Sequence, residues 1–187
     1  MSAGASKIVN AVLYELGWAC CVFGAAWGYP LLGGGLALLL VLVHLWLAQE
    51  RRTEVRLIAL AIALGILVDS SQQAFGLLSF KPDALGLWLP LWVFVIWAQF
   101  ATLFHYALSW LVDRPLVAML FGLVGGPLAY GGGIRLGAAE FGPNPTLSLI
   151  VLAVIWSLVV PLMAWLSTRI GYPSGQYRGV FERSNYA

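Results

Sequence analysis

The chain has 187 residues, of which 61% are hydrophobic and only 10% are charged, with a formal net charge of +2. Soluble domains carry about 25% charged residues, so this composition excludes a soluble globular domain and indicates a chain whose solvent is lipid. The small net charge, without a basic stripe or an acidic tail, excludes nucleic acid as a partner.

Six apolar stretches have the length, about 20 residues, that a membrane-spanning helix needs. In chain order they are residues 7–27, 31–49, 57–79, 87–112, 115–139 and 146–169. Short connections separate them, and a polar segment follows the last one. The sequence therefore predicts an all-α fold, a polytopic membrane helical bundle. Its domains are a six-helix transmembrane domain at 1–169 and a polar cytoplasmic tail at 170–187.

The first stretch is interpreted as a retained spanning helix, not as a cleaved signal peptide. Lys7 is the only early positive charge, and Glu15 interrupts the apolar core that a signal peptide would need. The adjacent residues Cys20 and Cys21 have no Cys-x-x-Cys or His/Cys spacing around them. They are expected to be two small buried side chains.

Lysine and arginine placement predicts the orientation in a bacterial inner (cytoplasmic) membrane. With six crossings and the N-terminus inside, eight of these residues fall on the cytoplasmic side and two on the outer side. The cytoplasmic eight are Lys7, Arg51, Arg52, Arg56, Arg114, Arg169, Arg178 and Arg183, and the outer two are Lys81 and Arg135. Both termini are therefore predicted to be cytoplasmic.

Five consecutive polar residues, from Asp69 to Gln73, lie in the middle of the third stretch. At helical spacing Asp69, Gln72 and Gln73 share one face with two glycines. An ionisable residue at this depth faces the interior of the bundle or a water-filled cavity. The remaining helices are expected to cover this face.

The fifth stretch combines close-packing and helix-breaking signals. Ala118, Gly122 and Gly126 form a small-xxx-small ridge that lets another helix approach closely. Pro127 removes a backbone donor, and the glycines at 131–133 favour unwinding. The sequence therefore predicts a helix that is kinked or broken at Gly125-Gly133.

Polar residues on several helices predict an inward-facing cavity that binds a ligand or handles protons. The candidates are Glu15, His44, Asp69, Gln72, Gln73, Gln99, His105, Tyr130 and Arg135. The alternative is an interhelical network that only fixes packing. No metal site is predicted, because no Glu-x-x-His or His-x-x-x-His pair places two ligands on one helix face. No motif specifies a cofactor or a catalytic residue.

Several stretches resemble a family of small bacterial multi-spanning inner-membrane proteins classed as a domain of unknown function. They are Leu87-Trp88-Leu89-Pro90-Leu91-Trp92, Phe100-Ala101-Thr102-Leu103, Ser109-Trp110-Leu111, Gly126-Pro127-Leu128-Ala129-Tyr130 and Arg135-Leu136-Gly137-Ala138. Trp18, His44-Leu45, Glu54 and Asp69 fit as well. Genes of this family often lie near genes for cyclopropane-fatty-acid-synthase-like methyltransferases and flavin-dependent oxidoreductases. The resemblance implies, by that association, a role in modifying membrane fatty acyl chains.

Three functions remain open at the level of sequence. The first is membrane lipid (fatty acyl) modification or handling, with membrane lipid as the partner. The second is a small transporter, since a broken helix beside a midplane acid is typical of transporter sites. The third is a structural or assembly subunit, in which the small-residue ridge would contact another copy of the chain or a membrane-protein partner.

Overall fold

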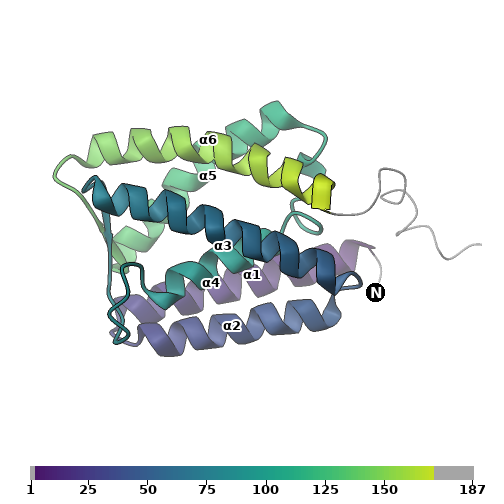
Figure 1. The fold of residues 1–187 in the computed structure, drawn as a ribbon, viewed down its shortest axis with the longest axis horizontal. Helices are drawn as coiled ribbons and strands as arrows, with labels where there is room; N and C mark the ends of the chain where they lie inside the picture. The colour runs from purple at the N-terminus through teal and green to yellow at the C-terminus, as the bar shows by residue number, and fades with distance from the viewer. Residues whose placement is uncertain (1–2, 171–187) are drawn as a thin grey trace, which may run out of the picture.

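The computed structural model describes residues 3–170, which form an all-α bundle of six helices (Figure 1). The helices are α1 (Ala3–Ala26), α2 (Pro30–Leu47), α3 (Arg51–Ala74), α4 (Leu91–Thr102), α5 (Pro115–Leu136) and α6 (Pro145–Ile170). A 3-10 helix, η1 (Ser109–Leu111), precedes α5, and two short strands are β1 (Leu78–Phe80) and β2 (Ala139–Phe141). The predicted tail lies, apart from Ile170, outside the described residues.

Successive helices run in alternating directions, so their connections gather at two opposite ends of the bundle (Figure 1). One end holds the start of α1, the α2–α3 connection, the turns before α5 and the end of α6. The other end holds the α1–α2 connection and the two strands. Among the described residues, the first end carries Lys7, Arg51, Arg52, Arg56, Arg114 and Arg169, and the second carries Lys81 and Arg135. The charge asymmetry on which the predicted orientation depends is thus present between the two ends.

Four of the described helices are long and apolar enough to cross a membrane, namely α1, α2, α5 and α6. Helix α3 has 24 residues, but its first turns carry Arg51, Arg52, Glu54 and Arg56. Helix α4 is apolar but has only 12 residues. At 1.5 Å per residue it is about 18 Å long, against a hydrocarbon core of about 30 Å.

The helix in the fourth stretch is therefore shorter than expected. The sequence predicts one helix over 87–112, whereas α4 spans Leu91–Thr102. Pro90 has extended backbone and precedes the first turn of α4, which sets its beginning. After Thr102 the chain continues in turns and η1 to residue 113. A side chain from another helix supports these turns, because the Asn10 Oδ1 atom accepts a hydrogen bond from the Ala107 N–H at 3.2 Å. Sequence patterns within 87–112 carry no sign of this long-range contact.

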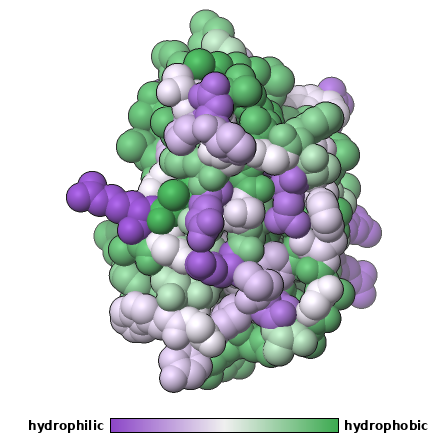
Figure 2. Space-filling view, turned by 90° about the vertical axis from the view of Figure 1, so that its left-hand side faces the viewer, coloured by the Kyte–Doolittle hydropathy of each residue, from purple (hydrophilic) through white to green (hydrophobic). Residues whose placement is uncertain are grey.

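The strands form a small antiparallel sheet that the sequence did not predict, in which Ser79 lies opposite Glu140. Helices α3 and α5 end before it, and so before the predicted limits at 79 and 139. Gly76 and Gly137 follow these ends with positive φ angles of 65° and 94°, which favour glycine as a helix terminator. Lys81 and Glu140 form a salt bridge of 3.1 Å on the sheet. Figure 2 shows this end of the molecule, where hydrophilic side chains gather in the middle of an otherwise largely hydrophobic outline.

Helix α5 packs against α6 along the predicted small-residue ridge. A Cβ atom on Gly122 would overlap the Trp156 carbonyl oxygen, and one on Gly126 would overlap the Trp156 ring. Ala118 is fully buried on the same face. The helix is continuous from Pro115 to Leu136, so it is not unwound at the three glycines. A bend at Pro127, which lies inside the helix, stays a prediction.

The bundle consists of two tightly packed helix pairs held together by α3 and α4. Helix α1 packs mainly on α2, where Gly24 and Gly33 bring the two backbones together, and α5 packs mainly on α6. Helix α4 contacts both α1 and α2 as well as α3. In contrast, α1 and α5 make few contacts with each other. This sparse contact leaves space inside the bundle between the two pairs.

Candidate functional site

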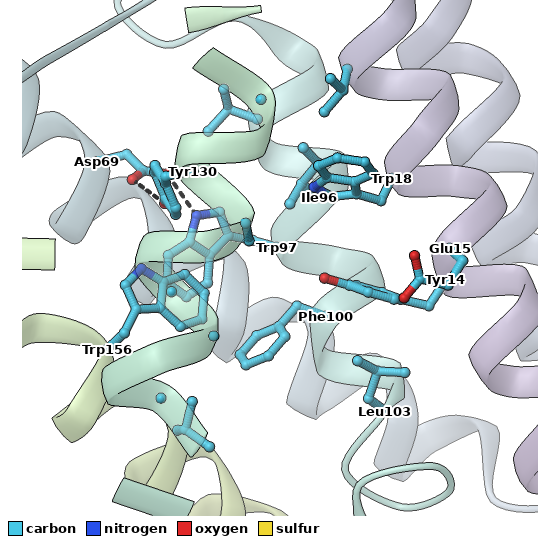
Figure 3. A pocket seen from close by; sticks show the side chains of 18 of the residues that line it. Tyr14, Glu15, Trp18, Asp69, Ile96, Trp97, Phe100, Leu103, Tyr130 and Trp156 are labelled. Atoms are coloured by element: carbon cyan, nitrogen blue, oxygen red, sulfur yellow. Dashed lines mark hydrogen bonds between the residues drawn. The ribbon is translucent and has the colours of Figure 1, made fainter. Parts of the chain in front are cut away.

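A cavity of about 340 Å³ occupies the space between α1 and α5 (Figure 3). Helix α5 contributes mostly small residues to it, including Gly125, Gly126 and Ala129. These residues leave room that larger side chains would fill. The aromatic residues that line the cavity are Tyr14, Trp18, Phe80, Trp92, Trp97, Phe100, Phe121, Tyr130 and Trp156. The cavity is therefore mainly apolar and aromatic, the usual character of a small-molecule site.

Asp69 forms the polar end of the cavity and connects three helices. The Tyr130 hydroxyl donates a hydrogen bond of 2.6 Å to Asp69 Oδ1, and the Trp97 indole N–H donates one of 2.7 Å to Oδ2 (Figure 3). The Gln72 amide donates a weaker bond of 3.4 Å to Oδ1. Asp69 is only 1% exposed. Both carboxylate oxygens thus have donors, as a buried carboxylate requires.

Trp156 places a polar atom without a partner beside Asp69 and Tyr130. Its ring stacks on Trp97 with centroids 5.3 Å apart, and its residue surface is 9% exposed. The indole N–H lies near the Tyr130 hydroxyl but forms no hydrogen bond of accepted geometry with any described residue. A buried donor without an acceptor is uncommon and costly. An acceptor on a bound molecule would satisfy it.

Glu15 and Tyr14 line the cavity from α1, on the side opposite Asp69 (Figure 3). Glu15 is exposed on the surface of the bundle, near the middle of its helix. Its carboxylate has no hydrogen bond or ion pair with any residue in the range 3–170. The Tyr14 hydroxyl points into the cavity (Figure 3). The cavity therefore extends from Asp69 on α3, whose carboxylate accepts hydrogen bonds, to Glu15 on α1, whose carboxylate has no partner among the described residues.

A second buried polar cluster lies closer to the end that holds the α2–α3 connection. Glu54 Oε2 lies 3.0 Å from His44 Nε2, and Oε1 lies 2.7 Å from His105 Nδ1. Asn10 Nδ2 faces His44 Nδ1 at 3.4 Å, and the carbonyl oxygen of Ser167 lies 3.1 Å from His105 Nε2. Glu54, His44 and His105 are 3%, 5% and 8% exposed. This cluster connects α1, α2, α3, α6 and the turn after α4.

The hydrogen-bond partners in this cluster decide which ring nitrogens of its histidines carry a proton. Asn10 accepts from a backbone N–H through Oδ1, so its Nδ2 donates and His44 Nδ1 accepts. His44 therefore donates from Nε2 to Glu54. The Ser167 carbonyl can only accept, so His105 donates from Nε2 and shares one further proton with Glu54 across Nδ1. The ring nitrogens are thus directed at protein groups, and the described residues contain no group of three such side chains arranged to hold a metal ion.

The structure divides the predicted site residues among separate locations. Asp69, Tyr130 and Glu15 line the cavity, with Gln72 bonded to Asp69. His44 and His105 belong to the Glu54 cluster. Gln73 donates to the Trp88 carbonyl in a connection, and Gln99 donates to the Ala37 carbonyl. Arg135 is exposed and does not line the cavity.

The sequence did not predict that Trp97 is a partner of Asp69 or that Glu54 is the partner of the two histidines. Trp97 is 28 residues from Asp69 and lies on another helix, so no local pattern connects them. The apolar pattern predicts a helix from residue 57 and so leaves Glu54 in the preceding connection, whereas α3 begins at Arg51. The sequence signal that could have found this cluster is an acid, Glu54, next to an apolar stretch, together with a histidine in each of the two neighbouring predicted helices.

Comparison with known proteins identifies the family and nothing more specific. No curated protein and no solved structure matches the chain. The model of a family described as "Protein of unknown function (DUF2878)" matches residues 7–162. Because this range covers most of the 187 residues, the chain belongs to that family.

Proposed function

We propose, starting from membership of a family whose function is unknown, that this protein binds an apolar, lipid-like molecule in the cavity between α1 and α5. The observation that carries the proposal is the aromatic cavity of about 340 Å³ with a polar group, Asp69, at one end. This volume falls in the range of about 300–1,000 Å³ typical of small-molecule sites. The chain itself is a membrane protein by the length and apolarity of four helices.

The position of the cavity supports a ligand that comes from the bilayer. The cavity lies between α1 and α5, which contact each other sparsely. Their outer surfaces are apolar, with Val12 and Leu16 of α1 49% and 53% exposed and Leu128 of α5 69% exposed. Such surfaces face lipid in a membrane-spanning helix. A molecule dissolved in the bilayer would reach the cavity between these helices without crossing water.

The lining supports an apolar ligand with a small polar group. Aromatic rings supply large contact areas, and Trp97 and Trp156 form a stacked wall beside Asp69. The Trp156 N–H, which has no acceptor among the described residues, is available to a polar atom at that end. Membrane lipid handling thus accounts for both the apolar walls and the local polar groups. Acyl modification and transport would each need a further feature, a reacting group or a second access route, and neither is proposed.

The small-residue ridge does not support a role as an assembly subunit. Ala118, Gly122 and Gly126 pack on α6 within the same chain, so this surface is already covered. We propose the bacterial inner membrane as the location, with both termini cytoplasmic. The six-to-two distribution of described lysines and arginines between the two ends supports that orientation.

The proposal is tested by filling the cavity. Ala129 lines it, so Ala129→Phe places a ring inside, whereas Leu128→Phe is a matched control on the adjacent, 69% exposed position. Each protein is purified in mild detergent and its bound molecules are identified by native mass spectrometry. The wild type and Leu128→Phe should retain a lipid-like molecule, and Ala129→Phe should lose it. Equal retention by all three, or none in the wild type, would contradict the proposal.

A further inference from the structure

The charges along the cavity are of one sign. Among the described residues, its lining includes two carboxylic acids, Glu15 and Asp69, and no lysine, arginine or histidine. An anionic group entering such a space meets repulsion and finds no cationic partner. Fatty acid carboxylates and phosphate groups are thus poor candidates for the part of a ligand that lies inside.

The two acids differ in what already surrounds them. Asp69 is 1% exposed and accepts short hydrogen bonds from Trp97 and Tyr130, so protein donors stabilise it. Glu15 has no such donor among the described residues and stands near the middle of a 24-residue helix. An ionisable residue within a spanning helix normally has a partner. Glu15 is therefore the acid of the cavity whose partner is missing.

Aromatic rings beside Glu15 favour a cation as that partner. Trp18 lies one turn after Glu15 on α1 and lines the same cavity, as does Tyr14. Figure 3 shows Tyr14 and Glu15 close together at this side of the cavity, with Trp18 one turn away. Indole and phenol faces attract ammonium groups, and aromatic cages with an acid recognise quaternary ammonium ligands.

We infer that the lipid-like ligand is an amphipathic cation, with an apolar chain inside the aromatic cavity and an ammonium group beside Glu15. This inference rests on the proposed function and names the chemical class of its ligand. Glu15 supplies the countercharge, and Trp18 and Tyr14 supply aromatic faces. The apolar walls formed by Ile96, Phe100 and Leu103 hold the chain. Glu15 is the residue that determines charge specificity.

The test compares amphiphiles that share one chain length and differ in charge. Wild-type protein, Glu15→Gln and the cavity-filled Ala129→Phe are placed in nanodiscs of digalactosyldiacylglycerol, an uncharged lipid without an ammonium group. Dodecyltrimethylammonium, dodecanol and dodecanoate are titrated while tryptophan fluorescence is followed, because four tryptophans line the cavity. The signal from Ala129→Phe measures partition into the bilayer and is subtracted. Wild type should bind the cation about tenfold more tightly than dodecanol, and dodecanoate more weakly than either.

The Glu15→Gln variant keeps the shape of the side chain and removes its charge. It should bring the ratio of cation affinity to dodecanol affinity close to one. A ratio that stays near tenfold in Glu15→Gln, or equal binding of all three amphiphiles by wild type, would overturn the cation inference while leaving the proposed function standing. Binding no greater than that of Ala129→Phe for every amphiphile would instead overturn the proposed function.

Discussion

Removing the carboxylate of Asp69 should destabilise the bundle, because this side chain accepts hydrogen bonds from two other helices. Asp69→Leu leaves the Trp97 N–H and the Tyr130 hydroxyl, now bonded at 2.7 and 2.6 Å, without their acceptor in an apolar interior. Hydrogen bonds to charged groups contribute about 1.5–3 kcal/mol each, and those between membrane helices contribute up to about 1.7 kcal/mol. Two bonds at about 1.5 kcal/mol give a loss of about 3 kcal/mol in the free energy of unfolding. For a chain of this size that corresponds to a melting temperature lower by about 6–12 °C.

Asp69→Asn is the matched control, because it keeps the shape and one acceptor oxygen. Asp69→Asn should lower the free energy of unfolding by about half as much as Asp69→Leu, since the hydrogen bonds that it keeps are no longer charge-assisted. The assay is thermal unfolding of each purified variant in the same mild detergent, followed by tryptophan fluorescence. Adding Tyr130→Phe to the wild type should lower the melting temperature, and adding it to Asp69→Leu should have almost no further effect. An Asp69→Leu protein as stable as wild type would show that the cost of burying the charge equals its hydrogen bonds, and would refute this reasoning.

Two further predictions concern the Glu54 cluster and the orientation of the chain. Glu54→Gln should cost less than about 1 kcal/mol, because its amide can accept from His44 and donate to a neutral His105 that still donates to Ser167. Glu54→Leu should cost about 3–5 kcal/mol, because it removes the partner of one nitrogen on each of two buried imidazoles. Thermal unfolding of the two variants checks this, and equal losses would mean that charge, not hydrogen bonding, stabilises the cluster. Reporter fusions after Gly86 and Arg114 should lie outside and inside the cytoplasm, respectively; the same location for both would contradict the predicted crossing by residues 87–112.

The helical bundle could be predicted from the sequence because composition and periodicity are local properties. Runs of about 20 apolar residues indicate helices in lipid, and residues 3–170 contain four such helices. The close contact of α5 was also predictable, because small residues four positions apart, such as Gly122 and Gly126, indicate that a neighbouring helix approaches. The depth of Asp69 likewise predicted a buried acid, and it is 1% exposed.

The partners of that acid depended on tertiary structure. Helical spacing and depth place the amide donors Gln72, Gln73 and Gln99 near Asp69, but of these three only Gln72 forms a hydrogen bond with it, at 3.4 Å. Gln73 and Gln99 donate instead to the backbone carbonyls of Trp88 and Ala37. Rotation of a helix about its own axis decides which neighbour a side chain meets, and hydropathy contains no information about that rotation.

The length of α4 and the position of the cavity were decided in the same way. An apolar run from 87 to 112 is compatible with one long helix, and the turn after Thr102 depends on Asn10, which binds the Ala107 N–H from another helix. The cavity exists because small residues of α5 face α1 across a gap that neither helix fills. The sequence by itself determined that the chain forms apolar helices and that α5 carries a ridge on which another helix can approach closely, since those are properties of short segments. Tertiary structure alone decided where the bundle is empty, because a cavity is defined by the side chains that fail to meet across it.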